Sequence, residues 1–210
     1  MTPNERREAD RSKAWGQDYK QSFMDRFGIW LSSVQIRRRM PTFRGKDVAD
    51  VGCGYHAAFS RSLRNEARSL TVIDMALSDE LKAMPNVIAI EGVLPDVLDG
   101  VPSSSVDIIL CNNVLEHLWE PARALARFRQ ILRPGGACFV NVPSWKGKVI
   151  LETAAFKLGL TSKDEINDHK AYYEPRELWS LVVRSGFKPS QVFCASHKFG
   201  LNTFAVCTIE

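Results

Sequence analysis

The sequence lacks the marks of membrane, secreted and metal-binding proteins. No stretch approaches the about 20 continuous apolar residues of a membrane-spanning helix, and the charged N-terminal segment does not resemble a signal peptide. The five cysteines are scattered without a C-x-x-C pair, and no carboxylate–histidine cluster has the spacing of metal ligands. We therefore expect a cytoplasmic protein with reduced thiols, no metal and no membrane span.

Charge of either sign is not in large excess either. The chain has 28 Lys and Arg residues against 24 Asp and Glu residues, and part of the excess lies in the run Arg37–Arg39. The resulting formal net charge of +4 does not require a nucleic-acid partner. The 210 residues, 45% of them hydrophobic, suffice for one globular domain with a buried core, and they contain no internal repeat.

The chain is organised around the stretch 48–56, Val-Ala-Asp-Val-Gly-Cys-Gly-Tyr-His. This stretch predicts a short buried strand over residues 47–51 that runs into a turn. Without a Cβ, Gly52 and Gly54 allow a tight turn and a close approach of the backbone to a ligand. Asp50 adds a carboxylate at the same point, where it would repel a pyrophosphate and attract a cation. A tight turn without any ligand is the alternative.

The glycine pattern alone leaves the type of ligand open. Gly52-x-Gly54-x-x-Ala57 also fits the dinucleotide fingerprint, and Asp74 lies about 20 residues further on, where an acid that binds ribose is expected. Both interpretations need a parallel sheet with the ligand at the carboxyl ends of its strands. The choice between them depends on the rest of the chain.

Seven apolar runs bounded by turn residues predict strands. These runs cover residues 47–51, 69–73, 86–90, 106–111, 137–142, 191–196 and 202–209. The loop around residues 198–201 is too short for a helical crossover, so the last two strands should form an antiparallel hairpin.

Helical patterns fall between most of these strands. They cover residues 22–39, 57–66, 78–83, 121–132, 147–158 and 175–185. Strands that alternate with helices predict right-handed βαβ units in one sheet. We therefore expect an α/β fold: a Rossmann-like, doubly wound, seven-stranded, mostly parallel sheet that ends in an antiparallel hairpin, with N-terminal helices and a cap insertion.

The first predicted helix carries an apolar stripe at helical spacing, formed by Phe23, Phe27, Trp30, Leu31 and Val34. Together with the arginines at its end, this stripe makes a basic amphipathic helix, a type that can lie on a membrane surface. The more frequent arrangement is that such a stripe packs on its own domain.

Several stretches together resemble one enzyme superfamily. Residues 50–54 (Asp-Val-Gly-Cys-Gly) resemble motif I of class I S-adenosylmethionine-dependent methyltransferases. Residues 113–118 (Asn-Val-Leu-Glu-His-Leu) and 132–136 (Leu-Arg-Pro-Gly-Gly) resemble the segments after the fourth strand and before the fifth in the ubiquinone-biosynthesis type (methyltransferase type 11/23). Residues 169–187 resemble the end of that domain. The order and spacing of the set favour a methyltransferase over a nicotinamide dehydrogenase.

The resemblance implies S-adenosylmethionine as the cofactor and S-adenosylhomocysteine as its product. Asp50 and the glycine turn would hold the methionine part, Asp74 would bind the ribose hydroxyls, and Met75 would lie against the adenine. Asn112 would lie near the sulfonium. The implied cofactor-binding residues are Asp50, Gly52, Cys53, Gly54, Asp74, Met75, Val93, Leu94 and Asn112.

The chain departs from the family pattern at two positions of this site. His56 stands where the family has a third glycine, and Val93 stands where it has an acid that binds the adenine amino group. Adenine would then contact the backbone of Val93 and Leu94. A homologue that binds the cofactor without turnover is therefore an alternative.

Methyl transfer from a sulfonium has an activated leaving group, so the protein mainly aligns the acceptor and excludes water. A base helps where the acceptor is a hydroxyl. His117 and His169 are the candidates for this base, because an imidazole titrates near neutral pH; structural roles are the alternatives. Trp145, Tyr172 and Tyr173 would shape the acceptor pocket.

These residues predict methyl transfer to a small-molecule acceptor, foremost to a hydroxyl oxygen of a sugar, a phenol or a quinone precursor. A nucleic-acid methyltransferase is disfavoured, because residues 112–115 (Asn-Asn-Val-Leu) stand where many such enzymes carry an Asn/Asp-Pro-Pro-Tyr-like motif. The arginine run leaves room for weak contact with a membrane surface, and the sequence does not indicate an oligomeric state.

We divide the chain into four parts of a single domain that spans residues 1–210. They are a helical lid (1–44), a cofactor-binding core (45–143), a substrate-cap insertion (144–174) and a closing helix with the hairpin (175–210).

Overall fold

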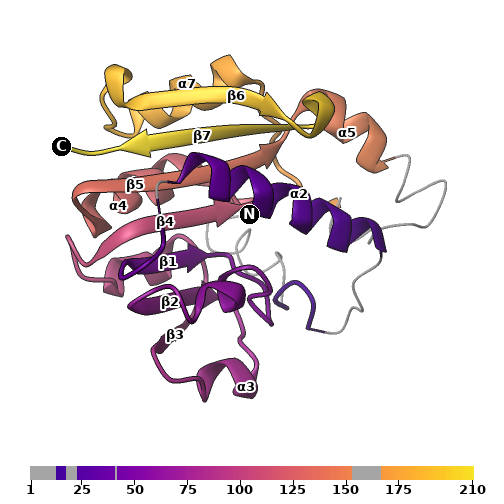
Figure 1. Ribbon diagram of the computed structural model, residues 1–210. Helices are drawn as coiled ribbons and strands as arrows, with labels where there is room; N and C mark the ends of the chain where they lie inside the picture. Colours follow the sequence, from indigo (N-terminus) through magenta and orange to yellow (C-terminus); the bar gives the residue numbers. More distant parts are fainter. Residues whose placement is uncertain (1–12, 18–22, 41, 153–166) are drawn as a thin grey trace, which may run out of the picture.

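The computed structural model describes residues 13–17, 23–40, 42–152 and 167–210 (Figure 1). Its strands are β1 Asp47–Val51, β2 Ser69–Asp74, β3 Val87–Glu91, β4 Val106–Asn112, β5 Leu132–Pro143, β6 Val192–His197 and β7 Asn202–Thr208. They form one sheet in the order β3-β2-β1-β4-β5-β7-β6. The first five strands pair in parallel, whereas β7 runs antiparallel to both β5 and β6. The predicted mixed sheet with a closing hairpin is confirmed.

Helices cover both faces of this sheet (Figure 1). The α-helices are α2 Phe23–Arg39, α3 Asp79–Lys82, α4 Pro121–Ile131, α5 Trp145–Glu152 and α7 Pro175–Arg184. Short 3₁₀ turns are η1 Ser60–Leu63, η2 Asp96–Gly100, η3 Leu115–His117, η5 Pro189–Gln191 and η6 Lys198–Gly200. Among the described helices, none is both long and apolar enough to cross a membrane.

The two faces of the sheet have separate apolar cores because successive strand residues point to opposite sides. On one face, Phe128 of α4 and Val182 of α7 pack with Ile109 of β4. On the other face, Ile36 of α2 packs in a cluster that includes Phe139 of β5. The continuous apolar runs in β4 and β5 follow from this coverage of both faces.

Two predicted helices differ from the structure. The segment predicted as a helix over residues 57–66 contains only the short turn η1. Its first residue, Ala57, has a φ of 44°, which is incompatible with an α-helix. The predicted helix 147–158 begins earlier, at Trp145, and its described part ends at Glu152, with residues 153–158 outside the described chain.

The apolar stripe predicted for α2 is covered unevenly: Leu31 and Val34 are half-buried, whereas the aromatic pair nearer the start of the helix is exposed. Phe27 and Trp30 are 44% and 57% exposed and stack on each other, with ring centroids 5.8 Å apart. The buried positions lie nearer the C-terminal end of the helix, at Ser32 and Ile36, and beyond its end at Met40. The expectation that the stripe packs on its own domain is therefore wrong for this aromatic pair.

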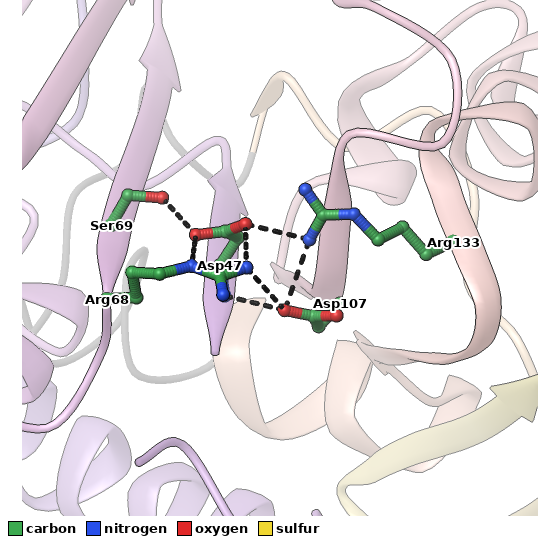
Figure 2. Close-up of polar contacts among 5 residues, drawn as sticks. All are labelled: Asp47, Arg68, Ser69, Asp107 and Arg133. Atoms are coloured by element: carbon green, nitrogen blue, oxygen red, sulfur yellow. Dashed lines mark hydrogen bonds and ion pairs between the residues drawn. The ribbon is translucent and has the colours of Figure 1, made fainter. Parts of the chain in front are cut away.

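A network of charged side chains joins the strands at the edge opposite their carboxyl ends (Figure 2). The Asp47 carboxylate accepts hydrogen bonds from Arg68 at 2.8 and 2.5 Å, from Ser69 at 2.8 Å and from Arg133 at 2.7 Å. Asp107 accepts the Asp47 amide at 2.8 Å and pairs with Arg133 at 3.2 Å. These contacts link β1, β2, β4 and β5 where the strands begin.

Candidate functional site

The turn after β1 closes because two glycines occupy positions that other residues do not fit. Gly52 and Gly54 have φ angles of +71° and +75°, in the left-handed region. A Cβ on Gly52 would lie 2.2 Å from Cγ2 of Val114, and a Cβ on Gly54 would lie 3.1 Å from Trp15. The Gly52 amide donates to the Ile73 carbonyl at 2.7 Å. The turn thus meets the end of β2 and the segment after β4.

Asp74, the last residue of β2, binds this turn directly. Its Oδ2 accepts a hydrogen bond from the Gly54 amide at 2.7 Å, and its Oδ1 accepts one from the Met75 amide at 2.8 Å. The Gly92 amide donates to the Asp74 carbonyl at 3.0 Å, which brings the end of β3 to the same place. The structure therefore joins three of the residues that the sequence analysis assigns to the cofactor.

Asp50 lies next to Asp74 in a different environment. It is only 7% exposed, and among the described residues no Lys or Arg forms an ion pair with it. Burial raises the pKa of Asp50 to about 7; the hydrogen bond from Ser60 opposes this effect and the charge of Asp74 adds to it. A cationic ligand at the turn would stabilise the charged form of this carboxyl group, because it would supply the missing opposite charge.

Cys53 lies in the turn but has no reactive character. Burial raises its pKa well above the usual value, and the charges of Asp50 and Asp74 act in the same direction. The thiol donates to the Gly54 carbonyl at 3.4 Å. Its place in the site is therefore that of a small neutral side chain.

The described N-terminal segment covers the turn. The Tyr55 amide donates to the Trp15 carbonyl at 2.8 Å, and the Tyr55 carbonyl accepts the Ser78 amide at 3.0 Å. Tyr19, the other aromatic residue before residue 20 of the predicted lid (1–44), lies outside the described residues. His56, which replaces a family glycine, is exposed and has its ring edge-on to Tyr55. The exposed imidazole does not fill the turn.

The end of β3 offers little side-chain chemistry to a ligand. Glu91 accepts the Leu77 amide at 2.8 Å and pairs with Lys82 at 2.8 Å, and the bond from Lys82 lowers the pKa of Glu91. Val93 is 50% exposed, whereas Leu94 packs against the core. Val93 and Leu94, the two residues assigned to adenine, therefore follow a glutamate whose carboxylate is already bonded to Leu77 and Lys82.

Asparagines connect the carboxyl ends of β4 and β5 with the start of β7. Buried Asn141 donates from Nδ2 to the side-chain carbonyls of Asn112 at 2.9 Å and Asn113 at 3.1 Å. Asn202 donates to the same Asn113 oxygen at 3.2 Å. The sequence analysis assigns only Asn112 to the site, and the network shows that its side-chain carbonyl is held in place by β5.

The turn η3 after β4 docks on the chain that precedes α7. The Glu116 carbonyl accepts the amides of Lys170 at 2.7 Å and Ala171 at 3.3 Å. Nδ1 of His117 lies 2.8 Å from Oδ2 of Asp168, and Lys170 donates to Oδ1 of Asp168 at 2.9 Å. This docking joins residues that are about 50 positions apart in the chain.

Asp168 stays ionised in this arrangement. Burial raises the pKa of Asp168, but its hydrogen bonds with His117 and Lys170 outweigh that effect and leave the pKa below its usual range. An ionised carboxylate only accepts hydrogen bonds, so the neutral imidazole of His117 carries its hydrogen on Nδ1, where it donates to Asp168, and keeps its lone pair on Nε2.

The two candidate histidines and the acceptor aromatics form one continuous group. The rings of His117 and His169 have centroids 4.7 Å apart, and Nδ1 of His169 lies 3.1 Å from the Tyr172 hydroxyl. The Tyr172 and Trp145 rings follow at 5.5 Å. Burial raises the pKa of Tyr172 to about 12, so its hydroxyl stays protonated. The Tyr173 amide donates to the Pro143 carbonyl at 3.1 Å.

A potential metal-binding arrangement appears at the same place. Glu116, His117 and His169 each offer one ligand atom, and these atoms all lie within 4.8 Å of one another. The sequence analysis expects no metal because no such cluster exists at ligand spacing along the chain. Folding brings the third residue in from a distant segment, which spacing alone does not reveal.

The sequence analysis does not identify Asp168, Lys170, Asn141 and Lys198, which belong to or border this group. Asp168 and Lys170 are the sequence neighbours of the candidate base His169, and their charges could have indicated that they belong to the same site. Asn141 and Lys198 lie in strand and hairpin positions that carry no motif.

Comparisons with known proteins give a consistent result. A family model described as "Methyltransferase domain" matches residues 25–192. A curated relative, the ubiquinone biosynthesis O-methyltransferase of Escherichia coli O6:H1, is 27% identical over 178 residues, which cover 80% of this chain and 73% of the relative.

Solved structures share the fold. A SAM-dependent methyltransferase from Archaeoglobus fulgidus superposes with a TM-score of 0.61 at 14% identity and covers 85% of this chain and 93% of its own. An S-adenosylmethionine-dependent methyltransferase from Mesorhizobium loti superposes with a TM-score of 0.58 at 16% identity. The match covers 82% of this chain and 95% of that protein's chain. At these identities the similarity establishes the architecture and leaves the acceptor open.

Proposed function

This chain belongs to the methyltransferase domain family, as a class I S-adenosylmethionine-dependent methyltransferase, and we propose that it methylates a hydroxyl oxygen of a small molecule. The observation that carries the proposal is the imidazole of His117 held through Nδ1 by Asp168, beside the edge where the cofactor residues meet. A hydroxyl acceptor needs such a base, whereas transfer to an amine nitrogen does not require one of this kind.

The cofactor residues support binding of a cationic methyl donor. Asp50, with its pKa raised to about 7, gains charge compensation from the ammonium and sulfonium groups of S-adenosylmethionine. Asp74 accepts the Gly54 amide, and we propose that its carboxylate also accepts the ribose hydroxyls. Met75, Val93 and Leu94 would contact the adenine from the ends of β2 and β3, Gly52 and Cys53 the methionine part, and Asn112 the region of the sulfonium.

In the proposed reaction, His117 takes the acceptor proton on Nε2 while Asp168 stabilises the resulting imidazolium through Nδ1. S-adenosylmethionine, held by Asp50, Asp74 and the glycine turn, would supply an activated methyl group to the acceptor oxygen and would become S-adenosylhomocysteine. His169 is held by Tyr172 at 3.1 Å and orients the acceptor hydroxyl between the two rings. Asp168 is a positioning residue in this scheme, since it acts through His117.

The acceptor pocket we propose contains Trp145, Tyr172 and Tyr173, which suit a flat or ring-shaped hydroxylated molecule. The curated relative from E. coli is named as an O-methyltransferase of ubiquinone biosynthesis, and its 27% identity supports transfer to oxygen. We propose a sugar, a phenol or a quinone precursor as the class of acceptor, in the compartment of cytoplasmic metabolism.

A second candidate mechanism uses a divalent cation. The ligand atoms of Glu116, His117 and His169, within 4.8 Å of one another, would suit an ion that binds the acceptor hydroxyl and lowers its pKa. Removal of divalent ions with EDTA distinguishes the two candidates: turnover by the imidazole base persists, and metal-assisted turnover stops and returns with added Mg²⁺ or Zn²⁺.

The first test is calorimetric titration of the protein with S-adenosylmethionine and, separately, NAD. We expect micromolar binding of the first alone, and affinity about 100-fold lower in Asp74→Ala, because a charged acceptor of two hydrogen bonds is lost. Asp79→Ala, in which an exposed carboxylate is removed, is the matched control and should bind like the wild type. Tight binding of NAD would contradict the assignment.

The second test is an acceptor screen by mass spectrometry with hydroxylated sugars and phenols. The expected product gains one methyl group on oxygen, and His117→Ala should form it at least tenfold more slowly, in line with the loss of a general base. Methylation only of amines, at a rate that His117→Ala does not change, would exclude the proposed oxygen chemistry.

A further inference from the structure

The tip of the closing hairpin lies at the ligand edge of the sheet. Pro143 at the end of β5 pairs with Asn202 at the start of β7, so the tip 198–201 lies just beyond the carboxyl end of β5. The Asn202 side chain donates to Asn113 at 3.2 Å, and Asn113 leads directly into η3. The tip therefore borders the group that contains the candidate base.

Hydrogen bonds fix the tip to the chain that leaves β5. Ser144 donates from its hydroxyl to the Gly200 carbonyl at 2.6 Å and from its amide to the Leu201 carbonyl at 3.0 Å. Nζ of Lys146 donates to the Phe199 carbonyl at 3.1 Å. The tip is thus held against the start of α5, the part of the chain assigned to the acceptor.

The backbone of the tip is strained. Lys198, Phe199 and Gly200 have φ angles of 50°, 59° and 83°, and only the last of them is a glycine. A left-handed conformation costs a non-glycine residue about 1 kcal/mol, and such strain concentrates at functional sites. Phe199 is 86% exposed, whereas the neighbouring Lys198 is partly buried. The strained turn thus places an ammonium group inside the protein.

The Lys198 ammonium lies beside α2, with Nζ 3.9 Å from the position that a Cβ on Gly28 would take. Burial lowers the pKa of Lys198 to about 8, and the charge of Glu116 opposes this effect. In the part of the chain that the structure describes, Nζ of Lys198 has neither a hydrogen bond nor an ion pair. Two other lysines near the tip and the candidate base have partners: Lys146 donates to the Phe199 carbonyl, and Lys170 pairs with Asp168.

We propose that Lys198 binds the carboxylate of the acceptor, so that the substrate carries both a carboxylate and the hydroxyl that receives the methyl group. This inference rests on the proposed function. The Lys198 ammonium is partly buried and has no hydrogen-bond or ion-pair partner among the described residues, so an anionic oxygen that accepts charge-assisted hydrogen bonds would stabilise it. An unbranched, point-charge donor such as lysine suits a single carboxylate oxygen.

The distribution of charge around the site supports one orientation of such an acceptor. Asp50 and Asp74 lie at the ends of β1 and β2, where they attract the cationic cofactor and repel a second anion. Lys198 lies beyond β5, on the other side of the β4 turn that carries His117. An anionic acceptor would therefore place its carboxylate at the hairpin tip and its hydroxyl toward the imidazole and the methyl group.

The test compares two probes that differ in the carboxylate alone: 3,4-dihydroxybenzoate and catechol. Each is titrated calorimetrically into protein saturated with S-adenosylhomocysteine, for the wild type, Lys198→Met and Lys198→Arg. We expect the wild type to bind the acid about tenfold more tightly than catechol, as one charge-assisted hydrogen bond contributes. Lys198→Met should lose that preference with unchanged affinity for catechol, and Lys198→Arg should keep most of it.

Lys188→Met is the matched control, because Lys188 is an exposed lysine that pairs with Glu210 far from the tip. It should keep the wild-type preference. Equal affinity of the wild type for both probes, no binding of the acid, or an equal loss for both probes in Lys198→Met would overturn the inference. Saturation with S-adenosylhomocysteine is measured first in every variant, so failure of the proposed function itself appears as loss of that binding.

Discussion

Asp47 and Asp50 lie three residues apart on β1, and both are buried, yet the protein shifts the pKa values of their carboxyl groups in opposite directions. Asp47, at the start of the strand, is bound by two arginines and a serine (Figure 2). The hydrogen bond from Arg68 holds the pKa of Asp47 well below its usual range. Asp50, near the end of the strand, has no basic partner among the described residues, and burial raises its pKa to about 7.

The difference separates two uses of a carboxylate in one sheet. At the edge where strands begin, the protein supplies its own counter-charges, and the network fixes the relative positions of four strands. At the edge where strands end, Asp50 has no basic partner among the described residues, and we propose that a cationic ligand supplies the opposite charge. Lys198 of the hairpin tip, which has no ion-pair partner in the described part of the chain, is the corresponding case of a cation, for which we propose an anionic ligand.

The largest expected effect comes from removing the ionisable group at Asp50, the carboxyl group without a basic partner among the described residues. We expect the free energy of unfolding of Asp50→Asn to exceed that of the wild type by an amount that grows from pH 4 to pH 7 and then levels off. The folded pKa of about 7 lies above the ordinary 3.8, so the folded wild type holds a proton that the unfolded chain releases, and it loses stability as the pH rises. The full difference is on the order of 4 kcal/mol.

Urea denaturation of both proteins across pH 4 to 8 measures this difference. Asp79→Asn, at a fully exposed position, serves as the control and should show no such trend. Saturating S-adenosylmethionine should reduce the stability gap at pH 8, because the bound cation compensates Asp50 in the wild type. A gap that does not change with pH would mean that Asp50 is already compensated in the folded protein.

The second effect comes from removing the paired carboxylate Asp47 at the other end of β1. We expect Asp47→Ala to lower the free energy of unfolding by about 2 kcal/mol at pH 7. This figure is below the cost of breaking a fully buried pair because Arg68 is 60% exposed. Since the folded pKa of Asp47 is depressed, its contribution is complete above about pH 4 and is lost as the pH falls further.

Thermal and urea unfolding at pH 7 and pH 3 provide the measurement, with calorimetry of S-adenosylhomocysteine binding as the second readout. The variant should bind S-adenosylhomocysteine like the wild type when folded, because the network lies at the edge opposite the candidate site. Loss of cofactor affinity at unchanged stability would show that this edge also controls the ligand end.

Much of the fold was predictable because local signals agreed with it. Apolar runs and turn residues predicted the existence of all seven strands, although β5 begins at Leu132 and not at the predicted residue 137, and the short loop before Asn202 required a hairpin. The helix after the glycine turn was predicted wrongly because the composition of residues 57–66 allows a helix, whereas the left-handed Ala57 does not. Packing of the aromatic residues of α2 on the domain was also predicted wrongly, because their spacing identifies a helix face but does not show what covers that face.

The candidate site was predictable only in part. The glycine turn and Asp74 stand in motifs, and the structure brings them together at 2.7 Å. The partnership of His117 with Asp168 depends on how the segment before α7 docks on η3, through backbone hydrogen bonds that no side-chain pattern encodes. For the same reason the grouping of Glu116, His117 and His169 could not be seen along the chain.

The smallest expected effect sharpens the comparison at Asp168, a carboxylate that lies at the ligand end but is paired like Asp47. It bonds both His117 and Lys170, and these bonds keep its pKa below the usual range in spite of burial. We expect Asp168→Ala to shift the neutral His117 imidazole from the Nδ1–H to the Nε2–H tautomer, which leaves no lone pair on the nitrogen that accepts the acceptor proton. Methyl transfer at pH 7 should fall about tenfold.

Nitrogen-15 NMR of the histidine side chains reports the tautomer without any acceptor, and turnover with the acceptor found in the screen reports the rate. Lys170→Met is the control: it removes the second partner of Asp168 but keeps the bond to His117, so the tautomer should persist. A purely structural Asp168 would instead lower stability with the same tautomer and the same rate. If His117 is the base that we propose, Asp168→Ala should change the rate of methyl transfer more than the stability, the reverse of Asp47→Ala.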